Sequence, residues 1–466
     1  MSAVLSSASL LAAASATSAA AAPDVQPEVQ PEAKAGGAAP TSRSGSANAS
    51  PDWLARAEAF GKTLSLEAAA RDTERRLPHA ELAELARSGL LSVTVPAVAG
   101  GPGVSASTLA GILIQLAAGD PNVAQAIQPH FCGIEKLRIY GTARQRAQLF
   151  GTVLEGTLVT NASAEKHTPR VGDIQTRLSA DGEAFRLDGN KAYNTGSLYA
   201  QYLYVLAGTP DGGRAIAWIP VARDGLRILD DWDGMGQRTT ASGSVVLERV
   251  IVSADEVMLL PPAAALRTYE GSFAQLLHAA IDAGIALAAF ADATHYGRTR
   301  ARPVPEAGVA RASEDPYVLH AVGEMATLAH GAVAMVNRAA AFVDAAIQQF
   351  FEPAGAAAPA IEVPLEPASE ATVDADTHRH QALDQALGRA SVAVAEAKMA
   401  ANEASLRVSE MLYRVGGASA TSRSLNLDRH WRNARTHTTH DPVAYKARAI
   451  GDFYLNDRLP PITTKI

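Results

Sequence analysis

The stretch Tyr202-Leu-Tyr-Val-Leu-Ala-Gly-Thr-Pro-Asp-Gly-Gly-Arg-Ala-Ile-Ala-Trp-Ile219 decides the fold, because two short hydrophobic runs in it flank a turn. Apolar runs on either side of a Pro-Asp-Gly-Gly turn are typical of a β-hairpin. Similar short runs, separated by turn residues, continue from Gly156 to about Val257. This spacing predicts a central β domain over residues 156–262, built as a small barrel or sandwich.

Helical patterns lie on both sides of the β segment. Ser50-Pro51-Asp52 is typical of a helix start, and the helical spacing that follows predicts an N-terminal helical domain over residues 51–155. Its later helical stretches include residues 122–130. Long Ala-rich runs predict a C-terminal helical bundle over residues 263–466, in which the Pro-, Ala- and Glu-rich segment 353–376 is a mobile loop. The fold class is therefore α+β, with several domains.

Composition limits the classes of function. The 466 residues carry a net charge of -7, with 47% hydrophobic and 19% charged residues, as in a soluble globular protein. Mild acidity argues against a nucleic-acid partner, and no apolar run reaches the roughly 18 residues of a membrane span. The lone Cys132 excludes an intrachain disulfide and fits a cytoplasmic protein. Residues 1–50, rich in Ala, Ser and Pro, predict a disordered tail, with an atypical export signal as the alternative.

The densest chemistry lies in Asp428-Arg-His-Trp-Arg-Asn-Ala-Arg-Thr-His-Thr-Thr-His-Asp-Pro442. Histidine gives or takes a proton near neutral pH, and arginine is a fork-shaped donor suited to phosphate. The segment indicates a site for an anionic cofactor with proton transfer; the alternative is a solvated basic helix end. We predict no metal, because the histidines lack a matching set of carboxylates.

The order of domains and several segments resemble the acyl-CoA dehydrogenase fold. These segments are Ala99-Gly-Gly-Pro-Gly103, Leu187-Asp-Gly-Asn-Lys-Ala-Tyr-Asn-Thr-Gly196, and Gly416-Gly417 followed by Asp428-Arg429. Residues 230–244, 281–303 and 431–442 are similar to one branch of that superfamily, the flavin-dependent monooxygenases of sulfur acquisition that act like dibenzothiophene monooxygenase.

One departure from the parent family bears on the reaction. Acyl-CoA dehydrogenases remove a proton α to the thioester with a carboxylate, most commonly in a Tyr-Glu-Gly segment near the C-terminus. Here the matching place, residues 433–440, contains no glutamate. Tyr269-Glu270-Gly271 occurs too early in the chain to match. The sequence therefore argues against desaturation of an acyl-CoA.

The resemblance implies that reduced FMN, supplied by a separate NAD(P)H-flavin reductase, reacts with O2 and transfers one oxygen atom to an organosulfur compound. The chain has no Gly-x-Gly-x-x-Gly or Walker pattern, which fits an external source of electrons. FAD stays open as the cofactor, with an FAD-dependent acyl-CoA dehydrogenase-like activity as the alternative and a non-catalytic scaffold as a third hypothesis. Gly284 and the many alanines around it permit close packing of helices. The resemblance also implies a homotetramer, which these small residues suit.

The same resemblance implies the site residues. His440 and then His437 are the expected acid–base groups, which share a face if their segment is helical; His130 is a further candidate on the substrate side. The expected cofactor contacts, each with an ordinary structural role as its alternative, are Asn161, Ser163, Thr195, Trp232, Arg298, Arg300 and Arg432. Spacing does not decide which of Arg298, Arg300 and Arg302 faces a flavin phosphate of a neighbouring subunit.

Overall fold

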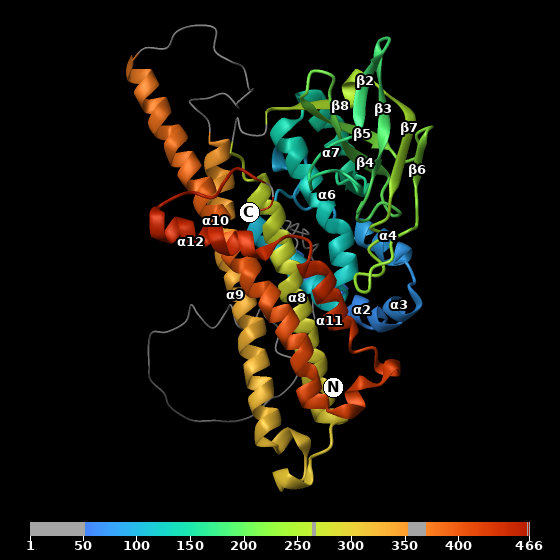
Figure 1. The fold of residues 1–466 in the computed structure, drawn as a ribbon, viewed down its shortest axis with the longest axis vertical. Helices are drawn as coiled ribbons and strands as arrows, with labels where there is room; N and C mark the ends of the chain where they lie inside the picture. The colour runs from blue at the N-terminus through green and yellow to red at the C-terminus, as the bar shows by residue number, and fades with distance from the viewer. Residues whose placement is uncertain (1–51, 263–266, 353–369, 464, 466) are drawn as a thin grey trace, which may run out of the picture. The chain divides into compact units, whose positions relative to one another are not determined.

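The computed structural model describes residues 52–262, 267–352, 370–463 and 465, and of residues 370–377 it describes the backbone alone. Helices, then strands, then helices follow one another along the chain (Figure 1), as the change of hydrophobic period predicts. The predicted tail, residues 1–50, lies outside the described residues. The predicted domain boundaries stay a prediction.

The N-terminal helices are α2 (Trp53–Ser65), α3 (Ala68–Glu74), α4 (His79–Arg87), α5 (Ala106–Gly119), α6 (Pro121–Tyr140) and α7 (Ala143–Leu154). Helix α2 begins after Asp52, whose side chain accepts a hydrogen bond from the Ala55 backbone N–H. Helix α6 continues through Pro129, well beyond the predicted stretch 122–130. An interior proline costs about 3 kcal/mol, and burial along nearly all of α6 outweighs this cost.

The strands are β1 (Val159–Ala162), β2 (Arg177–Asp181), β3 (Ala184–Lys191), β4 (Tyr202–Gly208), β5 (Arg214–Pro220), β6 (Leu226–Ile228), β7 (Val245–Val252) and β8 (Val257–Leu260). They form one mixed sheet in the order β6-β7-β3-β2-β4-β5-β8, and β1 lies parallel to β4. Strands β4 and β5 pair antiparallel from Tyr202 with Pro220 to Gly208 with Arg214, which confirms the predicted hairpin. The predicted β region between the two helical parts is thus confirmed, and its strands form one mixed sheet.

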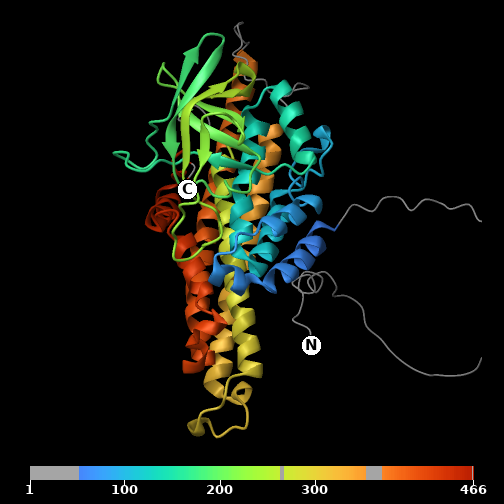
Figure 2. The same ribbon diagram turned by 90° about the vertical axis from the view of Figure 1, so that its right-hand side faces the viewer.

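The C-terminal helices are α8 (Glu270–Thr299), α9 (Pro316–Phe351), α10 (Glu370–Gly416), α11 (Arg429–Thr438) and α12 (Val443–Asn456). Short 3-10 turns stand at Ala97–Ala99, Ala254–Glu256, Pro305–Ala307, Ala312–Glu314, Ala418–Thr421 and Arg423–Leu425. Because α10 begins at Glu370, residues 370–376 of the predicted loop are helical; residues 353–369 lie outside the described part of the chain. Figures 1 and 2 show α8, α9 and α10 side by side.

Helix α8 lies at the centre of the packing, and small residues let α5 approach it closely. A Cβ added to Gly284 would lie 2.5 Å from the Ala117 Cβ and 2.8 Å from the Ile114 carbonyl oxygen. This confirms the close packing expected at Gly284. It also shows that the small-residue face is used inside the chain, so Gly284 is no argument for a tetramer.

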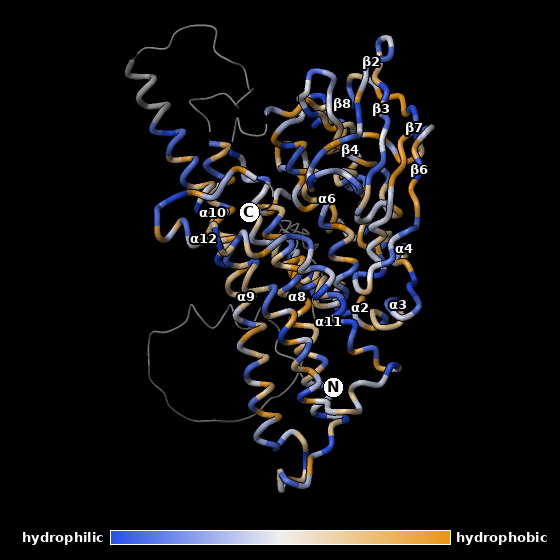
Figure 3. The backbone as a smooth tube through the Cα atoms, viewed as in Figure 1, coloured by the Kyte–Doolittle hydropathy of each residue, from blue (hydrophilic) through white to orange (hydrophobic). Residues whose placement is uncertain are grey.

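Helices α8 and α9 are long and apolar enough to cross a membrane by length and composition alone, which is weak evidence for a span. The apolar window of α8 is 78% buried inside the protein, as in the core helix of a globular domain, whereas that of α9 is 22% buried. Hydrophobic and hydrophilic residues alternate around α9 (Figure 3), which is typical of a helix with one packed face.

We expect Gly284→Ala to lower the free energy of unfolding by about 1–3 kcal/mol, because the added methyl group overpacks the α5–α8 contact. Gly151 in α7 has no heavy atom within 4 Å of an added Cβ, so Gly151→Ala should raise the same quantity by about 0.5–1 kcal/mol. Denaturant unfolding of both variants tests this, and equal effects would contradict the close packing.

Candidate active site

A chain of hydroxyl groups joins two of the predicted flavin contacts, Thr195 and Trp232. The Thr195 and Ser242 oxygens lie 2.9 Å apart, and the Ser242 and Thr240 oxygens lie 2.7 Å apart. Thr240 donates to the Gln237 carbonyl at 2.9 Å, and the Trp232 indole N–H donates to the same oxygen at 2.8 Å. Because Thr240 uses its only proton on this carbonyl, Ser242 must donate to Thr240, and Thr195 to Ser242. Thr195 therefore meets any ligand as a hydrogen-bond acceptor.

Several buried polar atoms in the same region have no protein partner. Among the described residues these include Asn161 Oδ1 on β1, Asn194 Oδ1, Thr239 Oγ1 and both amide atoms of Gln237. Each such atom costs about 1–3 kcal/mol if nothing bonds to it. The polar edge of a flavin ring carries both N–H and C=O groups, so these residues fit that group.

The backbone of Ser163 lies beside a buried ion pair. Its carbonyl accepts a hydrogen bond from Lys191 Nζ at 3.3 Å, and the same ammonium lies 2.6 Å from Glu165 Oε1. The Lys191 and Glu165 side chains are almost completely buried. This ion pair anchors the chain just after β1, so it positions Asn161 and Ser163 at the end of that strand.

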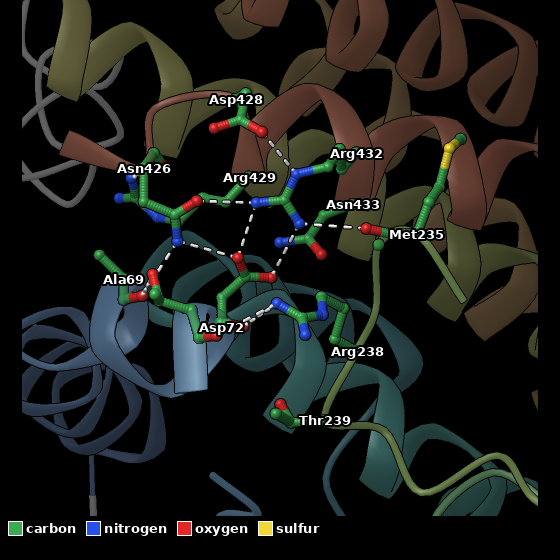
Figure 4. A network of polar contacts seen from close by, with 12 residues as sticks. Ala69, Asp72, Met235, Arg238, Thr239, Asn426, Asp428, Arg429, Arg432 and Asn433 are labelled. Atoms are coloured by element: carbon green, nitrogen blue, oxygen red, sulfur yellow. Dashed lines mark hydrogen bonds and ion pairs between the residues drawn. The ribbon is translucent and has the colours of Figure 1, made fainter. Parts of the chain in front are cut away.

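Arg432 ties α11 to α3 and to the loop before β7 (Figure 4). Its Nε donates to Asp428 at 2.7 Å, and its two amino groups donate to the Asp72 carboxylate at 2.7 and 3.2 Å. Further bonds go to Asn426 Oδ1 at 2.7 Å and to the Met235 carbonyl at 3.1 Å. All five N–H donors of the guanidinium are used. The geometry therefore gives Arg432 a structural role in place of the predicted phosphate contact.

Helix α11 also holds the loop that carries Trp232. The Gly236 N–H donates to Thr436 Oγ1 at 3.1 Å, and the Gln237 N–H donates to Asn433 Oδ1 at 2.7 Å. A Cβ on Gly236 would lie 2.0 Å from the Arg432 carbonyl oxygen. Only glycine fits this approach, so Gly236 allows the β-domain loop to reach α11.

The two predicted acid–base histidines occupy different environments. Helix α11 ends at Thr438, so His437 lies in the helix and His440 beyond it. The two histidines therefore do not meet the condition, one continuous helix, under which they would share a face. His437 is buried, whereas the side chain of His440 is 46% exposed. Both contact a histidine of α8 that the sequence reading missed: His278 Nδ1 lies 3.1 Å from His437 Nε2, and its ring centroid lies 4.4 Å from that of His440.

The buried histidines are held neutral. Burial lowers the pKa of His437, and the Asp282 carboxylate only partly offsets this. Burial, helped by the neighbouring His440 and His437, lowers the pKa of His278 well below its ordinary value. Both rings are therefore uncharged near pH 7 and can accept a proton. The Ala-rich run that becomes α8 contains a His and an Asp four residues apart, and this was the signal that could have identified His278 and Asp282 from the sequence.

His130 has no free nitrogen. Its Nε2 lies 2.7 Å from the Leu91 carbonyl, and its Nδ1 accepts a hydrogen bond from the Val159 N–H at 3.1 Å. The side chain is completely buried, and burial lowers its pKa to about 4. His130 thus joins α6 to β1, which is a structural role and not the predicted role on the substrate side.

The arginines at the end of α8 are not near the other predicted cofactor contacts. Arg298, Arg300 and Arg302 are exposed and make no hydrogen bond or ion pair with the described residues. The end of α8 points away from the sheet (Figures 1 and 2). These side chains are free to bind an anion, and within one chain they do not meet the Thr195 region.

Glu270 and Cys132 have ordinary structural surroundings. Glu270 lies in the first turn of α8, forms an ion pair with Lys136 and accepts a hydrogen bond from the Tyr140 hydroxyl at 3.2 Å. The thiol of Cys132 is buried, and burial raises its pKa to about 12. Neither group is placed to act as a base or a nucleophile.

Two families of known domains match the chain. The N-terminal domain of acyl-CoA dehydrogenases matches residues 54–157, and the C-terminal domain matches residues 276–357. The chain is 32% identical over 393 residues to the dibenzothiophene monooxygenase of Mycolicibacterium goodii, covering 82% of this chain and 88% of that protein. It is 32% identical over 420 residues to the probable FMNH2-dependent monooxygenase SfnC of Pseudomonas putida, covering 87% of this chain and 95% of that protein.

Solved structures show the same similarity. FMN-bound TdsC from Paenibacillus sp. A11-2 superposes with a TM-score of 0.78 at 31% identity, over 89% of this chain and 100% of that chain. The methanesulfinate monooxygenase MsuC of Pseudomonas fluorescens gives a TM-score of 0.76 at 31% identity, over 89% and 99% of the two chains. Butyryl-CoA dehydrogenase from Megasphaera elsdenii, at 20% identity and a TM-score of 0.70 over 87% and 97%, shares the fold alone.

We expect Arg432→Met to lower the free energy of unfolding of the flavin-free protein by about 3 kcal/mol, because it leaves the Asp72 carboxylate buried with its charge uncompensated. The matched variant Arg300→Met removes an exposed arginine and should change it by less than about 0.5 kcal/mol. Denaturant unfolding without flavin measures both. An Arg432→Met protein that is fully stable and only binds FMN more weakly would restore the phosphate role.

The low pKa of His130 makes the protein sensitive to acid. An unfolded histidine titrates near pH 6.5 and folded His130 near 4, so the unfolded chain takes up the proton first and stability falls as pH drops between these values. Between about pH 7 and 4.5, the free energy of unfolding falls by about 2–3 kcal/mol because of His130. In His130→Gln this pH-dependent decrease in the free energy of unfolding should vanish, although the variant is less stable than wild type at both pH values. Unfolding at both pH values measures it, and an unchanged difference would contradict the assignment.

Proposed function

We infer that this chain, which belongs to the flavin-dependent monooxygenase branch of the acyl-CoA dehydrogenase family, uses reduced FMN and O2 to oxygenate an organosulfur compound in sulfur acquisition. The observation that carries the proposal is the cluster of His437, His278 and His440. Two of these histidines lie in residues 433–440, the segment that by resemblance matches the one in which dehydrogenases of this fold most commonly carry a glutamate base. Histidines suit proton transfer near neutral pH.

The residues present divide the work between binding and proton control. Reduced FMN, when bound, supplies the two electrons with which one atom of O2 is transferred to the substrate and the other leaves as water. Thr195, which meets a ligand as an acceptor, suits an N–H group of the reduced ring. Asn161, with Ser163 beside it, offers a buried polar atom to the ring edge. His440 and His437 would move the protons that leave with the water.

The proposed binding of the FMN phosphate depends on the proposed assembly of four chains. Arg298 and Arg300 would bind the FMN phosphate of a neighbouring subunit, since they are exposed and lack partners in their own chain. A homotetramer formed through the C-terminal helices would bring them there. The apolar window of α9, only 22% buried within the described chain, supports such an interface. An NAD(P)H-flavin reductase would supply the reduced FMN, and we place the enzyme, as a soluble protein, in the cytoplasm.

The alternative is an FAD-dependent oxidoreductase that acts like an acyl-CoA dehydrogenase. It needs a carboxylate base close to the flavin. Residues 433–440 contain none, and Glu270 is already paired with Lys136. The alternative is therefore less well supported than the monooxygenase.

Anaerobic titration with reduced FMN, followed by mixing with isotope-labelled O2 and either dibenzothiophene or methanesulfinate, tests the proposal. We expect labelled oxygen in the sulfur product, and a delay between O2 uptake and the return of oxidised-flavin absorbance. His440→Ala should reduce product formation by about 10²–10⁴-fold, whereas His380→Ala, which removes an exposed histidine of α10, should not. Immediate flavin oxidation without labelled product, together with retention of FAD and oxidation of acyl-CoA substrates, would overturn it.

A further inference from the structure

Helices α8, α10 and α11 bury an ion pair that the proposed reaction has not used. Lys398 Nζ lies 2.6 Å from Asp282 Oδ2, and both side chains are at most 1% exposed. The other carboxylate oxygen of Asp282 lies 2.6 Å from His437 Nδ1. A buried ion pair adds little net stability, since an apolar pair of the same size is often as stable. Its direct bond to His437 points to a role in setting the state of that ring.

The charges decide which nitrogen of His437 is basic. Burial raises the pKa of Asp282, but His437 and Lys398 outweigh burial and hold it below its ordinary value. The carboxylate is therefore ionised and accepts only, so the proton of neutral His437 lies on Nδ1. The lone pair is then on Nε2, which lies 3.1 Å from His278 Nδ1. The Gln125 side-chain oxygen lies 3.0 Å from the same nitrogen; because an oxygen cannot donate to a lone pair, the Gln125 amide must turn so that its NH2 group faces Nε2.

The groups around His437 come from every neighbouring element. Helix α8 supplies Asp282 and His278, α10 supplies Lys398, and α6 supplies the uncharged Gln125. The segment after α11 supplies the following ionisable groups, which face one another around Asp441: His440, Asp441, Lys446 and Lys465. Among these, Asp282 is the only carboxylate that bonds to His437 itself in the described structure.

We propose that Asp282 and Lys398 are positioning residues that keep Nε2 of His437 as the basic atom of the site, where it shares a proton with His278. The ring of His278 in turn lies against the exposed His440, which leads this proton towards solvent. The inference rests on the proposed function, because it gives His437 the proton step of that reaction. It adds three residues, Asp282, Lys398 and His278, to the machinery.

The two members of the ion pair act on His437 in opposite directions. The negative charge of Asp282 raises the pKa of His437, and the positive charge of Lys398 lowers it. Asp282→Asn should therefore lower the pKa of His437, and Lys398→Met should raise it, by about one unit or more each. If the reaction needs neutral His437, the acid limb of the pH–rate profile moves to lower pH in Asp282→Asn and to higher pH in Lys398→Met.

The chain offers a matched control. His430 Nε2 lies 2.8 Å from Asp292 Oδ2, so a second buried histidine of α11 bonds to a second aspartate of α8. Asp292 bonds onward to Arg429 and not to His278. Asp292→Asn therefore removes the same kind of bond between the same two helices, and it should leave both the state of His437 and the pH–rate profile unchanged.

The experiment records the nitrogen NMR signals of isotope-labelled histidine rings as the pH is varied, first in the protein without flavin. The signals that disappear in His437→Gln are those of His437. Wild type should show a proton on Nδ1, and the single variants should shift the His437 titration in opposite directions. If Asp282→Asn fails to fold because Lys398 is left buried without its carboxylate, the double variant Asp282→Asn/Lys398→Met replaces it in the experiment, because it removes both charges. It should lose the Nδ1 preference. The acid limb of turnover with reduced FMN is then measured in the same proteins.

The inference would be overturned if Asp282→Asn and Lys398→Met shifted the pKa of His437 in the same direction, or if Asp292→Asn shifted it equally. A proton on Nε2 of His437 in the wild-type protein would also overturn it. The proposed function and the positioning role are contradicted by different results. A wild-type protein that shows the expected NMR behaviour but gives no oxygenated product with reduced FMN would retain the positioning role and overturn the reaction. Product formation with an unshifted acid limb in both variants would retain the reaction and overturn the positioning role.

Discussion

Helix α8 is buried along most of its length, and the polar side chains of its buried part, among them His278 and Asp282, bond to partners on other elements. A buried polar or charged group without a partner costs several kilocalories per mole. His278 and Asp282 therefore fix the place of His437, Asp292 fixes the place of Arg429 and His430, and Gln275 bonds to Asp441 at 2.6 Å. The docking of α10, α11 and the segment after α11 follows from this constraint.

Helix α11 transmits the constraint to the β domain. Its His437 meets α8, and its Asn433 and Thr436 hold the loop before β7. Arg432, with all its donors used, fixes this arrangement against α3, and Gly236 permits the close approach. The loop can then present Trp232 and Gln237 beside Thr195. The loop of Trp232 and Gln237 and the histidine cluster are thus both held by one short helix.

The proposed function places the proton-transfer groups of this chain on α11 and on the residues that follow it. A fold of this kind supplies a dry region between a sheet and helices, and the chemistry depends on which side chains enter it. In the proposed function, histidines that burial keeps neutral would take the place of a carboxylate base. A neutral imidazole can take up a proton and return it within one catalytic cycle, which suits oxygen transfer better than desaturation.

The sequence alone determined the order of helices and strands, the β4–β5 hairpin, the close packing at Gly284 and the branch of the family. These features depend on local periodicity, turn residues and short motifs, all of which involve residues that are close together in the chain. Tertiary structure decided the roles of His130 and Arg432, the separation of His437 from His440, and the contribution of Asp282 and Lys398. Residues 282, 398 and 437 are far apart in the chain, and only the packing of α8, α10 and α11 brings them within hydrogen-bonding distance. A hydrogen bond between such distant residues leaves no local pattern, so the amino-acid types suggested what the site could do, and burial determined which atoms can do it.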